Sequence, residues 1–209
     1  MPDLPKNAQD FQALSGVSRE TLAAYELWYK LLCQWNAKIN LVAPSSLSRF
    51  WSRHVLDSHQ ITALIPKPAQ TVLDMGAGAG FPGLALAITS PTPSRTVHLV
   101  ETNGKKCNFL RAVIRALKVP AVVKQARIET IETQVYDIIT ARAFASLVDL
   151  LNYSERFWGE HTLGLFPKGE HWQDELKAAQ ARFTFDVEDT PSLTNPDARI
   201  LGIRHLKRK

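Results

Sequence analysis

The residues best placed to do chemistry are the closely spaced glycines of VLDMGAGAGFPGLALAI, residues 72–88. The order of residue types predicts a strand, a glycine loop and a helix. Gly76, Gly78 and Gly80 would let the backbone turn sharply and let a ligand approach it closely. In open α/β sheets, ligands bind in the crevice at the carboxyl ends of the strands, where such a loop lies. The loop is therefore the predicted cofactor site.

Two classes of cofactor use a loop of this kind. Gly78, Gly80 and Gly83 fit the dinucleotide pattern G-x-G-x-x-G. Asp74, directly before the glycines, instead fits D-x-G-x-G-x-G, which is typical of class I methyltransferases that use S-adenosyl-L-methionine. Glu101 ends the next predicted strand, where a carboxylate can bind the ribose hydroxyls of either cofactor. The pattern favours a methyltransferase over a dehydrogenase, with a purely structural turn as the third alternative.

The elements that position this loop follow from an alternation of strand-like and helical runs after Thr71. The strand-like runs are TVLDMG, TVHLVE, AVVKQA, YDIITARA and TLGLFPKG, and helical patterns lie at residues 84–89, 105–118, 128–132, 147–158 and 170–181. This alternation predicts a doubly wound, mostly parallel α/β sheet, the Rossmann-like fold of class I methyltransferases. The last two runs, FTFDVED and ARILGIRHL, lack a long helix between them and predict a C-terminal antiparallel pair.

Residues 1–68 are predicted to form an N-terminal helical extension before a domain at 69–209. Apolar residues recur at helical spacing between Ser18 and Asn40, and Pro44 is expected to end that helix. The members of the apolar face are Leu22, Tyr25, Tyr29, Leu32 and Trp35. A second helix is expected to start near the serines at 45 and 46.

The positive charge of the chain is concentrated in two segments. Residues 104–127 hold seven basic residues and no acidic one, and residues 199–209 hold five more, again with no acidic one. These segments carry +12 and the rest of the chain −7, which together give the net charge of +5. Segregated positive charge indicates a polyanionic partner such as RNA, and the alternative is a solvated helix face with a basic tail.

Composition argues against several classes of protein. Cys33 and Cys107 have no paired spacing, which argues against disulfides and cysteine zinc sites and favours the cytoplasm. Cys107 falls on the apolar side of its predicted helix and is expected in the core. The six histidines show no metal-ligand spacing, so no metal is expected. The longest uncharged run, residues 75–94, contains four glycines and three prolines and does not predict a membrane span.

Several blocks together resemble a known family. They are WNAKINLVAP, RHVLDSH, VLDMGAGAGFPGLALAI, LVETNGKKCNFLRAV, ITARAFASL and LFPKG, in this order between about Trp35 and Gly169. The chain resembles the RsmG (glucose-inhibited division protein B) family of 16S ribosomal RNA guanine-N7 methyltransferases. Ile39 departs from the aromatic residue that many members have before the Asn-Leu pair. The resemblance implies a bacterial cytoplasmic enzyme that uses S-adenosyl-L-methionine.

The resemblance also implies roles for individual residues. Gly76, Gly78, Gly80 and Phe81 would line the methionine and ribose part of the cofactor, Glu101 would hold the ribose, Ile128 and Glu129 would flank the adenine, and Arg142 would contact the cofactor. Arg53 and His54 lie in RHVLDSH, and Lys168 lies in a further family block. Arg53 could also pair with Asp57 on one helix face, and His54 could be a core histidine.

The chemistry of guanine N7 needs no proton removal, because its in-plane lone pair is already nucleophilic. Methylation of an exocyclic amine would call for an N-P-P-Y type loop after the fourth strand, but that loop reads ITARAFASL. Methylation of a carbon atom would call for a nucleophilic cysteine, but no cysteine lies at a predicted strand end. We therefore assign no catalytic side chain and expect proximity and desolvation to drive transfer. Positive charge moves to the purine, so Arg142 is expected at the cofactor carboxylate, guanine O6 or a phosphate, or as a structural residue.

The expected partner is 16S ribosomal RNA or the small ribosomal subunit. The enzyme is expected to be a monomer. Lys105, Lys106 and Arg127 are predicted to contact the RNA, together with Arg53, His54 and Lys168. Two other classes stay open: a methyltransferase for another RNA, a protein or a small molecule, and a nucleotide-binding or oxidoreductase module. The basic segments favour RNA among these.

Overall fold

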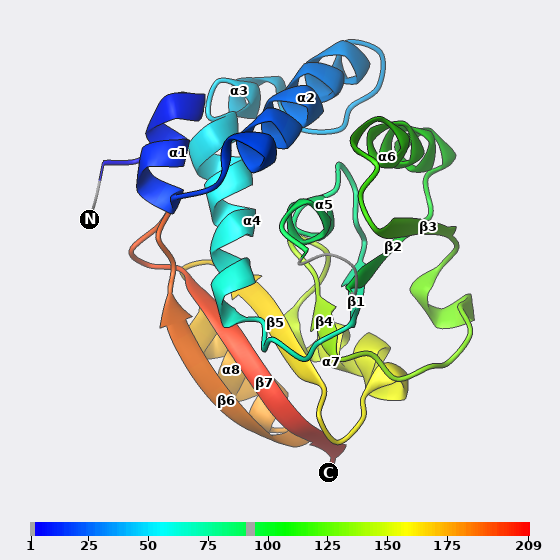
Figure 1. Cartoon of the computed structure of the whole chain (residues 1–209). Helices are drawn as coiled ribbons and strands as arrows, with labels where there is room; N and C mark the ends of the chain where they lie inside the picture. The colour runs from blue at the N-terminus through cyan, green and yellow to red at the C-terminus, as the bar shows by residue number, and fades with distance from the viewer. Residues whose placement is uncertain (1–2, 91–94) are drawn as a thin grey trace.

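Seven strands form one sheet in the order β3-β2-β1-β4-β5-β7-β6 in the computed structural model, which describes residues 3–90 and 95–209 (Figure 1). The strands are β1 (Thr71–Met75), β2 (Thr96–Glu101), β3 (Ala121–Gln125), β4 (Ile138–Thr140), β5 (Leu163–Lys168), β6 (Phe183–Pro191) and β7 (Arg199–Arg208). The first five are parallel, whereas β7 pairs antiparallel with both β5 and β6. The predicted doubly wound sheet with a C-terminal antiparallel pair is confirmed.

Helices cover both faces of the sheet. The elements after β1 are α5 (Gly83–Ile88), α6 (Gly104–Leu117), the 3-10 turn η3 (Ile128–Thr130), α7 (Leu147–Ser154), the 3-10 turn η4 (Glu155–Phe157) and α8 (Trp172–Gln180). Buried residues of α5 and α6 share one apolar core with the N-terminal helices, and those of α7 and α8 share a second core on the other face. The protein is thus a three-layer α/β/α sandwich, with each face of the sheet buried under helices.

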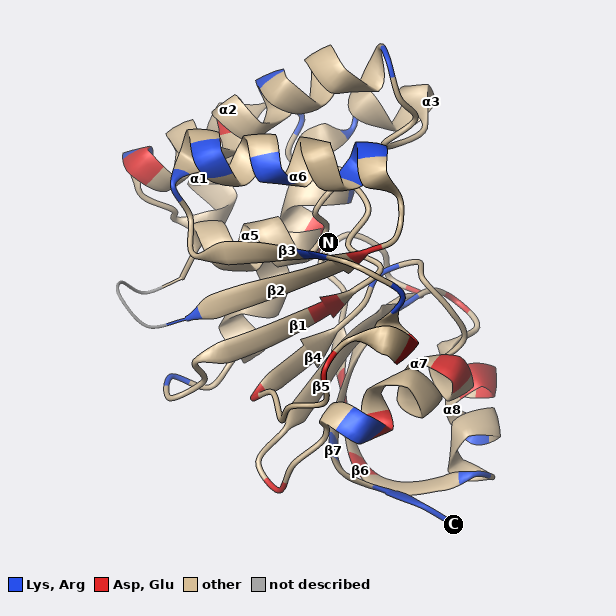
Figure 2. Cartoon of the chain, turned by 90° about the vertical axis from the view of Figure 1, so that its right-hand side faces the viewer, with Lys and Arg blue, Asp and Glu red and all other residues tan. Residues whose placement is uncertain are grey.

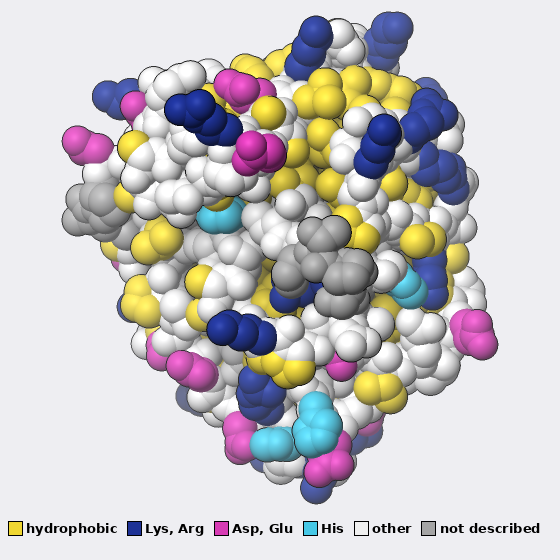
Figure 3. Space-filling view, in the orientation of Figure 1, with side chains coloured by type: hydrophobic (Ala, Val, Ile, Leu, Met, Phe, Trp, Pro, Cys, Tyr) yellow, Lys and Arg dark blue, Asp and Glu magenta, His cyan; other side chains and the backbone are white. Residues whose placement is uncertain are grey.

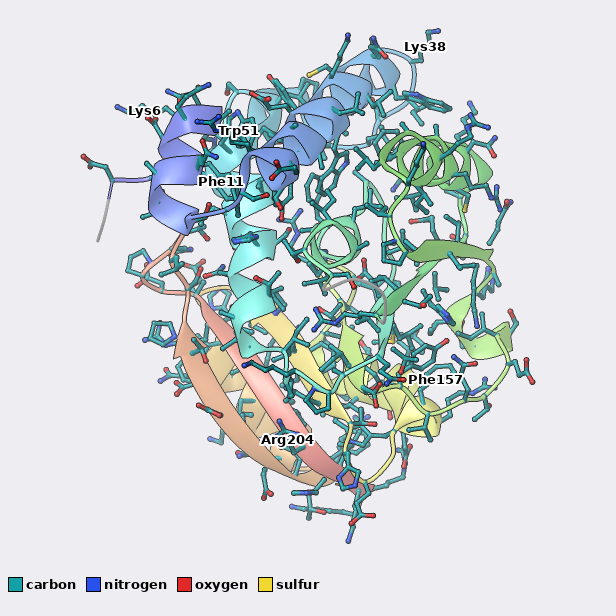
Figure 4. All side chains as sticks on the ribbon, viewed as in Figure 1. Lys6, Phe11, Lys38, Trp51, Phe157 and Arg204 are labelled. Atoms are coloured by element: carbon teal, nitrogen blue, oxygen red, sulfur yellow. The ribbon has the colours of Figure 1, made fainter. Side chains whose placement is uncertain are left out.

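The N-terminal extension consists of α1 (Ala8–Ser15), α2 (Arg19–Asn36), α3 (Pro44–Leu47), the π-helical segment η1 (Phe50–Leu56), α4 (Asp57–His59) and η2 (Gln60–Leu64). Phe11 of α1 and Trp51 of η1 point toward one another, with ring centroids 5.7 Å apart (Figure 4). These aromatic rings belong to the same buried core as α5 and the sheet. The extension is therefore packed onto the sheet domain through apolar contacts.

Two details of the helix predicted between Ser18 and Asn40 were wrong. The helix ends at Asn36, because the Oδ1 atom of Asn36 accepts hydrogen bonds from the backbone nitrogens of Leu41 at 2.9 Å and Val42 at 3.0 Å. Pro44 instead begins α3, where its missing N–H costs no hydrogen bond. The buried face also includes Trp28, which is completely buried, and the expected Tyr29 packs against the same core while partly exposed.

Helix α6 carries its charge on one side, as the sequence predicts. Arg111, Arg115 and Lys118 are exposed, and Figure 2 shows no acidic residue along α6. Cys107 is buried and its Sγ atom lies 3.3 Å from the carbonyl oxygen of Glu101, so its predicted core position is confirmed. Asn103 caps the helix by accepting hydrogen bonds from the backbone nitrogens of Lys105 and Lys106.

Within the described residues, no helix combines the length and the apolar character that crossing a membrane requires. Residues 91–94 of the uncharged run at 75–94 lie outside the described part of the chain.

Candidate functional site

The glycine turn joins β1 to α5 at the carboxyl edge of the parallel strands. Gly76, Gly78 and Gly80 have φ angles of 72°, 56° and 95°, a region that residues with a Cβ atom rarely adopt. The backbone nitrogens of Gly76 and Ala77 donate hydrogen bonds to the carbonyl oxygen of Val100 at 3.0 and 2.9 Å. These bonds hold the turn against the end of β2.

Glu101 points its carboxylate at this turn. Its Oε2 atom accepts a hydrogen bond from the backbone nitrogen of Gly78 at 3.0 Å, and its Oε1 atom accepts one from Asn103 at 2.8 Å. The residue is buried, yet it lines the cleft beside the turn. A buried carboxylate that keeps free lone pairs at the end of the second parallel strand can accept hydrogen bonds from two ribose hydroxyls.

Asp74 lies behind the turn and shapes it rather than facing the cleft. It is completely buried, and its Oδ2 atom accepts a hydrogen bond from the backbone nitrogen of Gly83 at the start of α5, at 2.9 Å. Its Oδ1 atom has no hydrogen-bond partner among the described residues. Burial raises the pKa of Asp74 to about 7, although the Gly83 hydrogen bond and the charge of Arg142 favour ionisation.

One cleft of about 1100 Å³ gathers most of the predicted site residues. The predicted residues that line it are Gly76, Gly78, Phe81, Glu101, Ile128, Arg142, Arg53, His54, Lys106 and Lys168. Gly80, Glu129, Lys105 and Arg127 are not among its lining residues. Gly80 is turned inward against Leu84, and Glu129, Lys105 and Arg127 are exposed outside the cleft.

Arg142, which follows β4, connects the sheet to the N-terminal extension. Its Nη1 atom lies 3.0 Å from Asp57 Oδ2 and 3.1 Å from the carbonyl oxygen of Arg53, and its Nη2 atom lies 3.2 Å from His54 Nδ1. The pairing of Arg53 with Asp57 suggested by their spacing was wrong, because Asp57 forms its ion pair with Arg142. The guanidinium therefore has structural partners, and its charge is neutralised beside the cleft.

Phe81 lies at the junction between the extension and the glycine turn. Its ring stacks on Trp28 at a centroid distance of 4.4 Å and on His54 at 4.8 Å, and the Arg142 guanidinium lies 4.8 Å from its centroid. Only 5% of Phe81 is exposed, so most of its surface is used in packing. The sequence could not identify Trp28 as its partner, because that contact forms only in the folded chain.

His54 is held neutral by its surroundings. Burial, together with the nearby charges of Arg142, Arg53 and Arg49, lowers its pKa to about 3. Because Arg142 is a donor, His54 Nδ1 must accept, which leaves Nε2–H to donate to Ser46 Oγ at 3.0 Å. The expectation of a core histidine is confirmed by its burial, and it still lines the cleft.

Lys168, at the end of β5, is also bonded within the protein. Its Nζ atom lies 2.7 Å from Glu175 Oε2 and 3.0 Å from the carbonyl oxygen of Ala145, and the residue is buried. Glu175 Oε2 also accepts a hydrogen bond from the backbone nitrogen of Leu147 at 2.7 Å. This ion pair joins α8 and β5 to the loop that follows β4.

The loop between β6 and β7 closes one wall of the cleft, which the sequence did not indicate. Thr194 Oγ1 donates a hydrogen bond to Asp57 Oδ1 at 2.8 Å, and the backbone nitrogen of Leu193 donates to Gln60 Oε1 at 2.7 Å. Gln60 Nε2 lies 3.3 Å from Ser192 Oγ. The polar run PSLTN was the available signal, but nothing local in it points to the N-terminal extension.

A second, smaller groove of about 280 Å³ lies where α6 begins. It is lined by Lys38, Ile39, Asn40, Asn103, Lys105 and Lys106. Figure 3 shows Lys and Arg side chains standing out over the region of α6. Lys106 lines both the groove and the cleft, so this basic surface is continuous with the cleft.

The described residues contain no cluster of His, Cys, Asp and Glu that could hold a metal ion. The groups of the cleft instead have the chemistry that suits a nucleoside with a charged side chain: the buried Glu101 carboxylate, the glycine turn and the buried apolar side chain of Ile128.

Comparison with known proteins decides between the cofactor classes. The family profile described as GidB, rRNA small subunit methyltransferase G, matches residues 21–201. The chain belongs to the GidB family. A ribosomal RNA small subunit methyltransferase G from Parvibaculum lavamentivorans is 41% identical over 203 residues, covering 96% of this chain and 90% of the relative. Its namesake from Rhodospirillum centenum is 45% identical and covers 95% and 91%.

Solved structures support the GidB fold. The structure of M. jannaschii TYW2 in complex with AdoMet matches with a TM-score of 0.57 and 19% identity, covering 83% of this chain and 80% of that one. The ribosomal protein L11 methylase of Lactobacillus delbrueckii matches with a TM-score of 0.54 and 16% identity, covering 73% and 77%. This GidB protein is a methyltransferase, and its cofactor is S-adenosyl-L-methionine, as the sequence predicted.

Proposed function

We propose that this methyltransferase transfers a methyl group to N7 of a guanine in 16S ribosomal RNA of the small ribosomal subunit. Membership of the GidB family supports ribosomal RNA as the substrate. The basic surface at the cleft supports a polyanionic substrate, because Arg49, Arg53 and Lys106 line the cleft that contains the glycine turn.

The observation that carries the choice of N7 is the state of the acids and bases in the cleft. The carboxylates among its described lining residues are Asp57, Glu101 and Glu175. Asp57 and Glu175 are ion-paired, and Glu101 accepts a hydrogen bond from the glycine turn while its remaining lone pairs would bind the ribose. The lining histidine, His54, has both ring nitrogens engaged and a pKa near 3. A target that must lose a proton before attack would need a free base here. Guanine N7 carries no proton, so its attack on the methyl group needs no base.

The reaction is a direct displacement. The cofactor supplies an electrophilic methyl group on a sulfonium. The N7 lone pair forms the new N–C bond while the S–C bond breaks and its electron pair returns to sulfur. Positive charge therefore moves from sulfur to the purine, and the protein must align the two groups and exclude water.

The residues of the cleft divide this work. Glu101 would hold the ribose hydroxyls, Gly78 would let the cofactor lie against the backbone, and Ile128 would flank the adenine. Gly76 would leave room for the Phe144 ring beside the turn, and Glu129, which is exposed outside the cleft, would reach the adenine only from the rim. Phe81 would support the turn from behind, with Gly80 permitting the tight bend. Arg142 would offer its remaining N–H groups to the cofactor carboxylate while Asp57 neutralises it.

The RNA would enter across the basic rim. Lys105, Lys106 and Arg127 would bind phosphates along α6 and the end of β3, and Arg53 would do so from the extension. Buried Lys168 and His54 would act by shaping the cleft floor, since their own polar atoms are already bonded. Phosphate contacts position the RNA without specifying its sequence.

The direct test is methyl transfer from labelled S-adenosyl-L-methionine to purified 16S RNA, to intact small subunits and to 23S RNA, followed by nucleoside mass spectrometry. The proposal predicts label in 7-methylguanosine of the small-subunit RNA. Label in another nucleoside, or in 23S RNA alone, would contradict it.

We further propose that residues 1–68 act as an RNA-facing extension of the methyltransferase domain at 69–209, and that the protein works as a monomer in the cytoplasm. The extension supplies Arg49, Arg53 and Asp57 to a cleft that one chain completes. Gel filtration with light scattering, with and without RNA, tests the monomer.

A further inference from the structure

The loop between β4 and α7, residues 141–146, is held by ion pairs near both of its ends. At its start, Arg142 is held by Asp57 at 3.0 Å. Toward its end, Lys168 donates to the carbonyl oxygen of Ala145, and its partner Glu175 accepts from the backbone nitrogen of Leu147. A loop anchored in this way holds the residues between its anchors in one position.

Phe144 lies between these anchors with its ring presented to the cleft. The residue lines the cleft and is 40% exposed, and it is the one aromatic residue among the large apolar side chains that the described structure shows exposed. Ala143 before it has a φ angle of 52°, a conformation that costs free energy for a residue with a Cβ atom. Fixed anchors, a strained neighbour and an exposed ring together indicate a function for Phe144 rather than packing.

The ring also lies against the glycine turn. A Cβ atom added to Gly76 would collide with the Phe144 side chain, so one edge of the ring packs against the turn at Gly76 and leaves Gly78 free. The ring also contacts Tyr153, with a centroid distance of 5.8 Å and a tilt of 47°. The exposed part of the ring therefore borders the same space as the cofactor turn.

We propose that Phe144 stacks on the target guanine and places its N7 in line with the methyl group; this inference rests on the proposed function. A base that leaves its own stack needs a replacement π-face, and an exposed aromatic ring provides it. Stacking uses the face of the purine and leaves the in-plane N7 lone pair free to attack. The basic residues of the rim, Arg49, Arg53 and Lys106, select a base that belongs to a polyanion.

An aromatic face also suits the charge that develops. As the methyl group transfers, the purine becomes cationic, and the negative face of a benzene ring attracts it more strongly than it attracts the neutral base. Arg142, the cation on this loop, is paired with Asp57, so it repels the cationic purine less than an unpaired arginine would. Phe144 would thus stabilise the transition state more than the ground state.

The first test compares the full-length parent with Phe144→Leu and Phe144→Tyr on small-subunit RNA. Leucine keeps an apolar side chain without the ring, and we expect kcat/KM to fall about 10- to 100-fold, the range of lost base stacking. Tyrosine keeps the ring and should stay within about 3-fold of the parent by the same reasoning. Affinity for S-adenosylhomocysteine, measured by calorimetry, should stay unchanged in both. Val122→Ala, which trims a half-exposed apolar side chain outside the cleft, is the control.

The second test replaces Phe144 with pentafluorophenylalanine, which keeps the shape of the ring and reverses the charge of its face. We expect the single-turnover rate to fall more than RNA affinity. Parent-like transfer by Phe144→Leu, or a loss of cofactor affinity that explains the fall, overturns the inference. A parent that methylates a different nucleobase contradicts the proposed function. The ratio of kcat/KM between Phe144→Leu and the parent then still measures the contribution of stacking. A parent that methylates no RNA contradicts both.

Discussion

The carboxylate of Asp57 lies 3.0 Å from the guanidinium of Arg142 and joins the N-terminal extension to the loop after β4. The two residues are 85 positions apart in the sequence. Asp57 also accepts a hydrogen bond from Thr194, so three distant parts of the chain meet at one carboxylate. The pair lies in the wall of the cleft and neutralises a positive charge at a place where the reaction creates another.

Replacing Asp57 with Asn tests this role. The amide keeps an acceptor for Thr194 but removes the negative charge that is paired with Arg142, so we expect the single-turnover rate to fall about 10-fold, the effect of roughly 1.4 kcal/mol of added repulsion. Glu155→Gln, which breaks the exposed Arg208 pair outside the cleft, is the matched control. Equal rates for both variants would show that the pair is only structural.

Gly78→Ala separates cofactor binding from folding. Gly78 has a φ of 56°, and an added Cβ would meet the protein only at the carbonyl oxygen of Gly76, 3.8 Å away in ordinary contact, so the methyl group would project toward the ligand. We expect a loss of S-adenosylhomocysteine affinity of about 10-fold or more, measured by calorimetry. Gly16→Ala is the control. Gly16 has a similar φ of 68° and open space for a Cβ atom, but it does not line the cleft. If both variants bind like the parent, the glycine turn is not the cofactor site.

The rate of methyl transfer should depend little on pH. With saturating cofactor and RNA, we expect a nearly flat single-turnover rate between about pH 6 and pH 9, because N7 needs no base. His54 stays neutral through this range, since its pKa lies near 3. A tenfold rise per pH unit would report an essential base and would contradict direct attack by N7.

Stability should depend on pH through Asp74. Its pKa of about 7 in the folded protein lies above the ordinary 3.8, so the folded state retains a proton that the unfolded chain releases. Stability from this group is therefore complete below about pH 4 and falls as pH rises to about 7, by an amount on the order of a few kcal/mol. Asn cannot ionise, so Asp74→Asn should gain stability relative to the parent across this window. If the difference between the thermal unfolding midpoints of the two proteins stays constant from pH 4 to pH 8, Asp74 does not have a raised pKa in the folded protein.

The basic start of α6 should bind RNA without reading its sequence. Replacing Lys105 and Lys106 with Ala should weaken binding to all RNAs alike and reduce the slope of log affinity against log salt by about one unit per lost contact. Cofactor affinity should not change. The control pair is Lys177 with Arg182, which are exposed outside both the cleft and the groove. An unchanged slope would place the RNA path elsewhere, such as along the N-terminal helices and the C-terminal tail.

The parts of the fold that the sequence predicts are those that local patterns determine. β1, the glycine turn and α5 are contiguous, so their order alone places Gly76 and Gly78 at the carboxyl edge of the sheet. Glu101 follows because neighbouring parallel strands end at the same edge. The antiparallel pair of β6 and β7 was also predictable, because the connection is too short for a helical crossover.

The parts that the sequence did not predict depend on contacts between distant segments. Asp57 seemed matched to Arg53 by helical spacing, but the fold brings Arg142 closer to it. Asn36 ends α2 with a side-chain hydrogen bond to residues ahead of it, which overrides the expected stop at Pro44. Phe144 showed no periodic pattern, and its exposure at the cleft appears only once its loop is anchored.

Nucleoside mapping of ribosomal RNA from a strain that lacks this gene tests whether the chain methylates guanine N7 in 16S RNA. We predict the loss of one 7-methylguanosine from 16S RNA, its return when the parent chain is restored, and no return with Gly78→Ala at equal protein level. An unchanged 7-methylguanosine content in 16S RNA, with a different modification lost instead, would contradict it.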